Sequence, residues 1–129
     1  MKKMFLLATI LLSVVCASAQ KTSSVESGKL KICDLTSSNS LTNCSNVDYG
    51  VSTASIGNHK IAIVYNSGRL KVCDITSSNS LTNCSNIESY GVSNAQMSGD
   101  GRIIITYDNG SKKACNITSS NSTTNCSRL

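Results

Sequence analysis

Three pairs of cysteines with one spacing constrain this chain more than any other feature. Each pair has the form Cys-x10-Cys, and its first cysteine recurs after 40 and then after 42 residues. The pairs are Cys33 and Cys44, Cys73 and Cys84, and Cys115 and Cys126. The surrounding sequence repeats too, because residues 28–46 return nearly unchanged as 68–86 and more loosely as 110–127. The chain is therefore built from copies of one unit.

The cysteine segment of each unit predicts a β-hairpin with a polar tip. If Cys33 faces Cys44 across the hairpin, then Leu35 faces Thr42 and Thr36 faces Leu41. Residues 37–40 then form the turn. Directly opposed residues on antiparallel strands lie close enough for a disulfide, especially at a non-hydrogen-bonded pair. We therefore predict one disulfide within each cysteine pair, worth roughly 2 to 3 kcal/mol through the entropy of loop closure.

A zinc site is the competing interpretation of six cysteines. Zinc sites usually contain closely spaced pairs such as Cys-x2-Cys, often together with histidines. This chain has no such pair, and His59 is its single histidine. We therefore expect disulfides, and neither a metal nor a cofactor.

The first nineteen residues have the three parts of a secretory signal peptide. Two lysines precede an apolar-rich run over residues 4–16, and a small-residue cleavage site ends at Ala19. The alternative is a lipoprotein with Cys16 as the lipidated residue, but Val15 stands where a small residue is expected. We expect a secreted or periplasmic protein, because an oxidising compartment suits the six remaining cysteines.

The charge of residues 20–129 argues against nucleic acid as a partner. Ten basic residues face seven acidic ones there, since Lys2 and Lys3 account for two of the twelve lysines and arginines. The balance is close to +3 and includes no basic run, so it lacks the electrostatic pattern of a nucleic-acid-binding surface. No later apolar segment approaches the roughly 20 residues of a membrane helix, so we expect no membrane span.

Turn residues between β-rich runs predict an all-β fold of antiparallel four-stranded units. Asn-Ser-Gly at 66–68 and Asp-Asn-Gly at 108–110 are typical of hairpin turns. The strands expected for one full unit are 51–56, 60–65, 69–75 and 81–87, with the same pattern again from 92 to 129. The repeat domain covers 28–129, with a half unit over 28–46 and full units over 47–86 and 87–129; residues 20–27 are a linker or a partial strand, with 22–26 as the candidate strand.

The combined motifs resemble a known family. A Gly-Asp-Gly turn, an apolar strand ending in tyrosine, a turn ending in glycine and the run Leu-Lys-Val-Cys-Asp at 70–74 are similar to bacterial secreted β-propeller repeats of the YVTN and NHL-like kind. The resemblance covers residues 28–129 and implies propeller blades with a cysteine-stapled outer hairpin. Propellers need about four to eight blades, and this chain supplies about two and a half. The resemblance thus implies an incomplete propeller, a ring completed by several copies, a short open stack capped by its own polar loops, or a fragment of a longer ancestral gene.

Catalytic residues are hard to find in this sequence. His59 lies in a predicted turn, and disulfide pairing leaves no free thiol for nucleophilic chemistry. The family includes lactonase-like enzymes, but the histidine and carboxylate groups that they need are not evident here. Asp34 and Asp74, with Asn116 at the third equivalent position, are expected to be structural residues at the hairpin edge. We therefore expect a protein that is not an enzyme.

Two tyrosines and the hairpin tips are the candidate binding groups. Tyr49 and Tyr90 each precede a glycine at the start of a full unit, where a ring can stack on a sugar or a peptide, with core packing as the alternative. The Thr-Ser-Ser-Asn-Ser tips form a hydroxyl and amide array that suits a glycan, or they are simply hydrophilic turns.

Three functions remain open. The first is an exported binding or adhesion module for a glycan or protein, in which repeated weak sites act together. The alternative is a structural protein that assembles with copies of itself, as a homo-oligomer. A lactonase-like hydrolase is the third.

Overall fold

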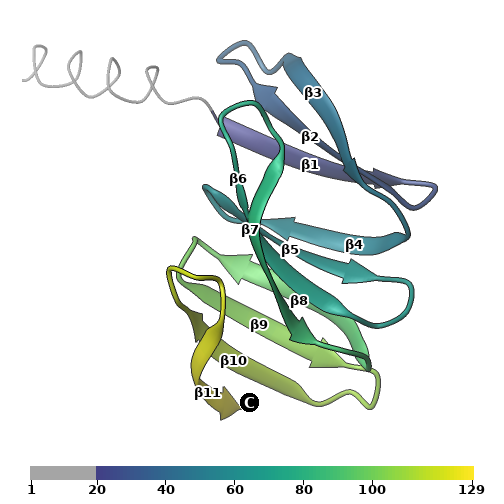
Figure 1. Cartoon of the computed structure of the whole chain (residues 1–129), viewed down its shortest axis with the longest axis vertical. Helices are drawn as coiled ribbons and strands as arrows, with labels where there is room; N and C mark the ends of the chain where they lie inside the picture. The colour runs from purple at the N-terminus through teal and green to yellow at the C-terminus, as the bar shows by residue number, and fades with distance from the viewer. Residues whose placement is uncertain (1–19) are drawn as a thin grey trace, which may run out of the picture.

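The computed structural model describes residues 20–129, and these form eleven β-strands in three antiparallel sheets (Figure 1). The predicted signal peptide over 1–19 lies outside the described residues. Within the described part of the chain, no helix is long and apolar enough to cross a membrane. The all-β fold is confirmed.

Each sheet is one unit of the repeat, with its strands in sequential order. The first unit contains β1 (Gln20–Glu26), β2 (Lys29–Leu35) and β3 (Leu41–Asp48). The second contains β4 (Val51–Ile56), β5 (Lys60–Tyr65), β6 (Leu70–Ile75) and β7 (Leu81–Glu88). The third contains β8 (Val92–Ser98), β9 (Arg102–Tyr107), β10 (Lys112–Ile117) and β11 (Thr123–Arg128). The candidate strand at 22–26 is therefore part of β1, which begins at Gln20.

The first unit lacks a counterpart of β4 and β8 among the described residues. In β1 Thr22 pairs with Cys33, as Ile61 of β5 pairs with Cys73 and Ile103 of β9 with Cys115. Strand β1 is thus equivalent to β5 and β9.

The three predicted disulfides are present, and the predicted register beyond them is wrong by one residue. Disulfides join Cys33 to Cys44, Cys73 to Cys84 and Cys115 to Cys126, each with a Cα–Cα distance of 4.1 Å. Towards the tip Leu35 pairs with Leu41 and not with Thr42, which pairs with Asp34. The cause is a β-bulge at Asn43, where φ is 55°. Asparagine tolerates this left-handed conformation, and the bulge adds one residue to β3.

The hydrophobic core lies between the sheets. The first interface packs Leu30 and Ile32 of the first unit against Ile61 and Ile63 of the second, all four fully buried. The second interface packs one face of the second unit against the third in the same way. Buried apolar residues there are Ala62, Val64, Leu70, Val72, Val92, Ala95, Met97, Ile103 and Ile105.

The three sheets follow one another along the long axis of the molecule (Figure 1). Strand β4 contacts β1 on one side and β8 on the other. The first and third sheets share no extensive contact, so residues 20–129 form an open stack and do not close a ring.

Polar residues replace apolar ones on the two end faces of the stack. Thr22 of the first unit stands at the position of Ile61, and Lys112 of the third unit stands at the position of Leu70. The second strand of the second unit, β5, is buried from Ile61 to Tyr65, whereas Ile104 of β9 is 36% exposed.

Candidate functional site

The hairpin tips of the second and third units adopt one conformation and reach onto the preceding sheet. In the second unit the backbone N–H of Thr76 donates to the carbonyl of Ser80 at 2.9 Å, and the N–H of Asn79 donates to the carbonyl of Thr76 at 3.0 Å. Asn79 takes a left-handed φ of 64°, and its equivalent Asn121 takes 66°. Both asparagines are fully buried although they occupy turns, which indicates specific contacts with the neighbouring unit.

Asn79 joins the second unit to a Lys–Asp pair of the first. The ammonium of Lys21 donates to Asp34 at 2.8 Å and to the side-chain oxygen of Asn79 at 2.7 Å. The amide nitrogen of Asn79 donates to the backbone carbonyl of Asn43 at 2.8 Å and to Asp34 at 3.2 Å. The bulge at Asn43 therefore has a role, since its carbonyl is one of the acceptors for the next unit.

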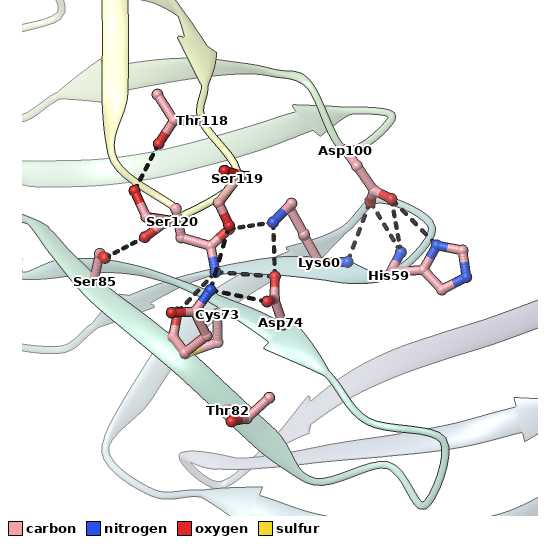
Figure 2. A network of polar contacts seen from close by, with 12 residues as sticks. His59, Lys60, Cys73, Asp74, Thr82, Ser85, Asp100, Thr118, Ser119 and Ser120 are labelled. Carbon is pink, nitrogen blue, oxygen red and sulfur yellow. Dashed lines mark hydrogen bonds and ion pairs between the residues drawn. The ribbon is translucent and has the colours of Figure 1, made fainter.

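Asn121 repeats this joint between the third and second units. Lys60 donates to Asp74 at 2.7 Å and to the side-chain oxygen of Asn121 at 2.5 Å. The amide of Asn121 donates to the carbonyl of Asn83 at 2.7 Å and to Asp74 at 3.0 Å. Figure 2 shows Lys60 and Asp74 beside the third-unit tip residues Ser119 and Ser120.

These joints hold the aspartates in the ionised form. Hydrogen bonds from Lys21 and Asn43 lower the pKa of Asp34. Burial opposes ionisation of Asp74, but hydrogen bonds from Lys60, Asn121 and Asn83 outweigh burial and lower its pKa. Every buried side-chain nitrogen or oxygen of the described residues has a hydrogen-bond partner. The aspartates that follow the first cysteines are thus parts of the joints between units.

A second contact between the second and third units surrounds Asp100. Its carboxylate accepts a backbone N–H bond from Asn58 at 2.7 Å. It also accepts backbone N–H bonds from His59 at 2.9 Å and Lys60 at 3.2 Å (Figure 2). Burial opposes ionisation of Asp100, but the bonds from His59 and Asn58 outweigh burial and lower its pKa. The His59 side chain is 81% exposed, with Nδ1 3.4 Å from the carboxylate, so the predicted solvent-facing turn is confirmed.

Tyr90 lies at a surface groove of about 610 Å³ between the end of β7 and the third unit. Its side chain is 79% exposed, which excludes core packing. The groove is also lined by Glu88, Tyr107, Lys113 and Arg128. The Tyr107 hydroxyl donates to Glu88 at 2.5 Å, and burial together with this bond raises the pKa of Tyr107. The hydrogen bond between Tyr107 and Glu88 therefore holds this wall of the groove in place. The exposed Tyr90 ring is free to contact a ligand.

The structure does not bring Tyr49 into this groove. Tyr49 is 62% exposed in the loop between the first and second units, so it too lies outside the core.

In the second unit the guanidinium of Arg69 lies 4.4 Å from the centre of the Tyr65 ring. Ser111 replaces Arg69 at the equivalent position of the third unit and is too short to cover Tyr107 in this way. Sequence reasoning missed the groove, although the change from arginine to serine was a visible signal.

The tips are not the uniform binding array that the sequence suggested. Two of the three place their asparagine fully inside a joint, and Asn39 of the first unit alone is exposed among the three. No group of three or more metal-ligating His, Cys, Asp or Glu side chains gathers within residues 20–129.

Comparison with known proteins adds no family to these observations. No protein-family model matches the chain, and no curated protein matches its sequence. What stands is an all-β repeat protein with one disulfide in each unit, and disulfides in such number are typical of oxidising compartments.

Proposed function

We propose that this protein is an exported binding module that holds an oligosaccharide in the groove beside Tyr90. The observation that carries the proposal is that Tyr90, 79% exposed, lies at the edge of a groove lined by several charged and polar residues. A tyrosine ring offers an apolar face with a polar tip, which suits the mixed apolar and hydroxyl surface of a sugar.

The polar lining supports the same ligand class. Glu88 and Asp108 supply carboxylate acceptors, while Lys113 and Arg128 supply donors, so hydroxyl groups find partners of both kinds. Lys113 also lies 3.5 Å from Glu88, which keeps the two charges paired when the groove is empty. The proposal includes no catalytic step.

We also propose that the three units are successive blades of an incomplete β-propeller. The support is the sequential strand order in each sheet, the contact of β4 with both β1 and β8, and the stapled hairpin at the far edge of each sheet. A single open groove binds weakly, so adhesion would depend on several copies acting together.

Binding of the purified protein to a glycan array, followed by calorimetry on each hit, tests the oligosaccharide proposal. Tyr90→Ala is expected to weaken binding about tenfold, since a stacked ring contributes on the order of 1.4 kcal/mol. Tyr49→Ala is the matched control and is expected to leave affinity unchanged, because this tyrosine is exposed but does not line the groove. A blank array, or equal affinity of the wild type and Tyr90→Ala, would overturn the proposal.

A further inference from the structure

We propose that a second copy of this chain docks head to tail, with the first-unit tip of one copy on the third sheet of the other through Asn39. This inference rests on the hairpin tips and not on the proposed sugar binding, although Lys112 both lines the groove and lies on the face that the second copy covers. The tip sequence Thr-Ser-Ser-Asn-Ser occurs at 36–40, 76–80 and 118–122. Asn39 has a φ of 63°, matching 64° at Asn79 and 66° at Asn121. It is therefore preshaped for a joint that this copy does not supply.

Among residues 20–129, Asn39 is the tip asparagine that does not lie in a joint with another unit. Its side chain is exposed, whereas those of Asn79 and Asn121 are fully buried. The backbone turn is closed as in the other units, because Thr36 N–H donates to Ser40 at 2.9 Å and Asn39 N–H donates to Thr36 at 2.9 Å. The tip thus keeps its shape without a neighbouring sheet, and an incoming partner has little conformational entropy to remove.

The third unit carries residues equivalent to those that contact the tip asparagine in the first and second units. We call this set the receiving site. Arg102 pairs with Asn116 in the register, as Lys60 pairs with Asp74 and as Lys21 pairs with Asp34 in the units before it. Arg102 Nη1 lies 3.3 Å from the side-chain oxygen of Asn116. Asn125 has the bulge conformation of Asn43 and Asn83, with a φ of 49°.

This receiving site can form the bonds of the internal joints. Arg102 can donate to the Asn39 oxygen, and the Asn116 oxygen and the Asn125 carbonyl can accept from the Asn39 amide. An amide at position 116 replaces the carboxylate of the earlier units, so each hydrogen bond retains a donor and an acceptor.

Backbone and apolar groups of the third sheet also lack the contacts that the next unit makes with the earlier sheets. The carbonyls of Gly28 and Gly68 each accept a backbone N–H from the next unit at 3.0 Å. Space is open at the equivalent Gly110. Ile104 is 36% exposed, where the equivalent Ala62 is fully buried under the next sheet. Each earlier sheet is covered by the following unit of this chain, and a second copy carries the tip that fits this one.

The polar end faces set the expected strength of the contact. Thr22 and Lys112 stand where the internal interfaces have isoleucine and leucine, so the contact between copies buries less apolar surface than an internal one. Association is therefore reversible and dependent on concentration. Two copies carry six sheets, within the range of about four to eight blades in closed propellers, so two identical contacts are able to close the assembly.

Sedimentation velocity and native mass spectrometry over a concentration series test this contact. Asn39→Gly keeps the left-handed turn and removes the amide, and it is expected to weaken association at least about tenfold. Arg102→Ala is expected to do the same from the other side. Ser37→Ala, in the same exposed tip, is the matched control and is expected to leave association unchanged.

A mixing experiment gives the sharpest readout. Asn39→Gly retains an intact receiving site, and Arg102→Ala retains an intact tip, so a mixture of the two variants forms one complete joint. The mixture is expected to associate more strongly than either variant alone. Circular dichroism and thermal unfolding check that both variants fold. A monomeric wild type throughout the series, or association that neither variant weakens, would overturn the proposal.

Discussion

The first hairpin tip and the third have the same first five residues, Thr-Ser-Ser-Asn-Ser, but lie in opposite environments. Asn121 is fully buried and connects two sheets, whereas Asn39 is exposed to solvent. Their backbone conformations agree, with φ of 66° and 63°. The comparison teaches that the tip is shaped by its own turn and that a neighbouring sheet then decides whether its amide becomes a structural contact.

The receiving residues differ in the same way along the chain. Lys60 and Asp74 form a 2.7 Å ion pair under the third-unit tip. Arg102 and Asn116 occupy the equivalent places in the third unit and make one exposed 3.3 Å hydrogen bond. The Lys60–Asp74 ion pair lies under a tip. The Arg102–Asn116 pair, which has no carboxylate, lies where no tip of this copy covers it.

The largest expected difference between these environments appears when each asparagine is replaced by glycine in a separate variant. Asn121→Gly removes hydrogen bonds to a lysine, an aspartate and a buried carbonyl, so the free energy of unfolding should fall by about 2 to 3 kcal/mol more than for Asn39→Gly. The backbone effect of glycine is common to both variants and cancels in the difference. Urea unfolding measures both, and equal losses would contradict a structural role for the Asn121 amide.

Acidification is expected to weaken the internal joints. The pKa values of Asp34 and Asp74 are lowered in the folded protein below the ordinary 3.8, so the unfolded chain binds protons first as pH falls. This stabilisation is fully present above about pH 4 and is lost as pH falls through the folded pKa values. The urea midpoint should therefore drop as pH falls below about 4, and less steeply in Asp74→Asn. A midpoint that stays constant or rises over this interval would exclude the account.

The local part of the fold was predictable because it depends on neighbouring residues. The spacing of Cys73 and Cys84 and the turn at 66–68 predict the hairpins without reference to other units. The register at Leu35 was not predictable by simple counting, because Asn43 takes a left-handed φ and adds a bulge residue. An asparagine just before the second cysteine of every unit was the available signal.

The joints required knowledge of how sheets pack on one another. Lys60 and Asp74 are 14 residues apart, and Asn121 lies 47 residues beyond Asp74, so no local pattern links the three. The repeat contained a clue, because lysine accompanies aspartate in two units and arginine accompanies asparagine in the third. The groove likewise depends on Ser111 standing in place of Arg69, a single change within a repeated segment.

A double-mutant cycle on Lys60→Met and Asn121→Gly tests the joint most directly. Methionine keeps much of the apolar stem of Lys60 and removes its charge, so the cycle isolates the contact between the ammonium and the amide. We predict a coupling of at least about 1 kcal/mol in the free energy of unfolding, because residues in one hydrogen-bonded network do not act independently. Additive losses from the two substitutions would contradict the claim that the buried asparagine joins neighbouring units through the Lys–Asp pair.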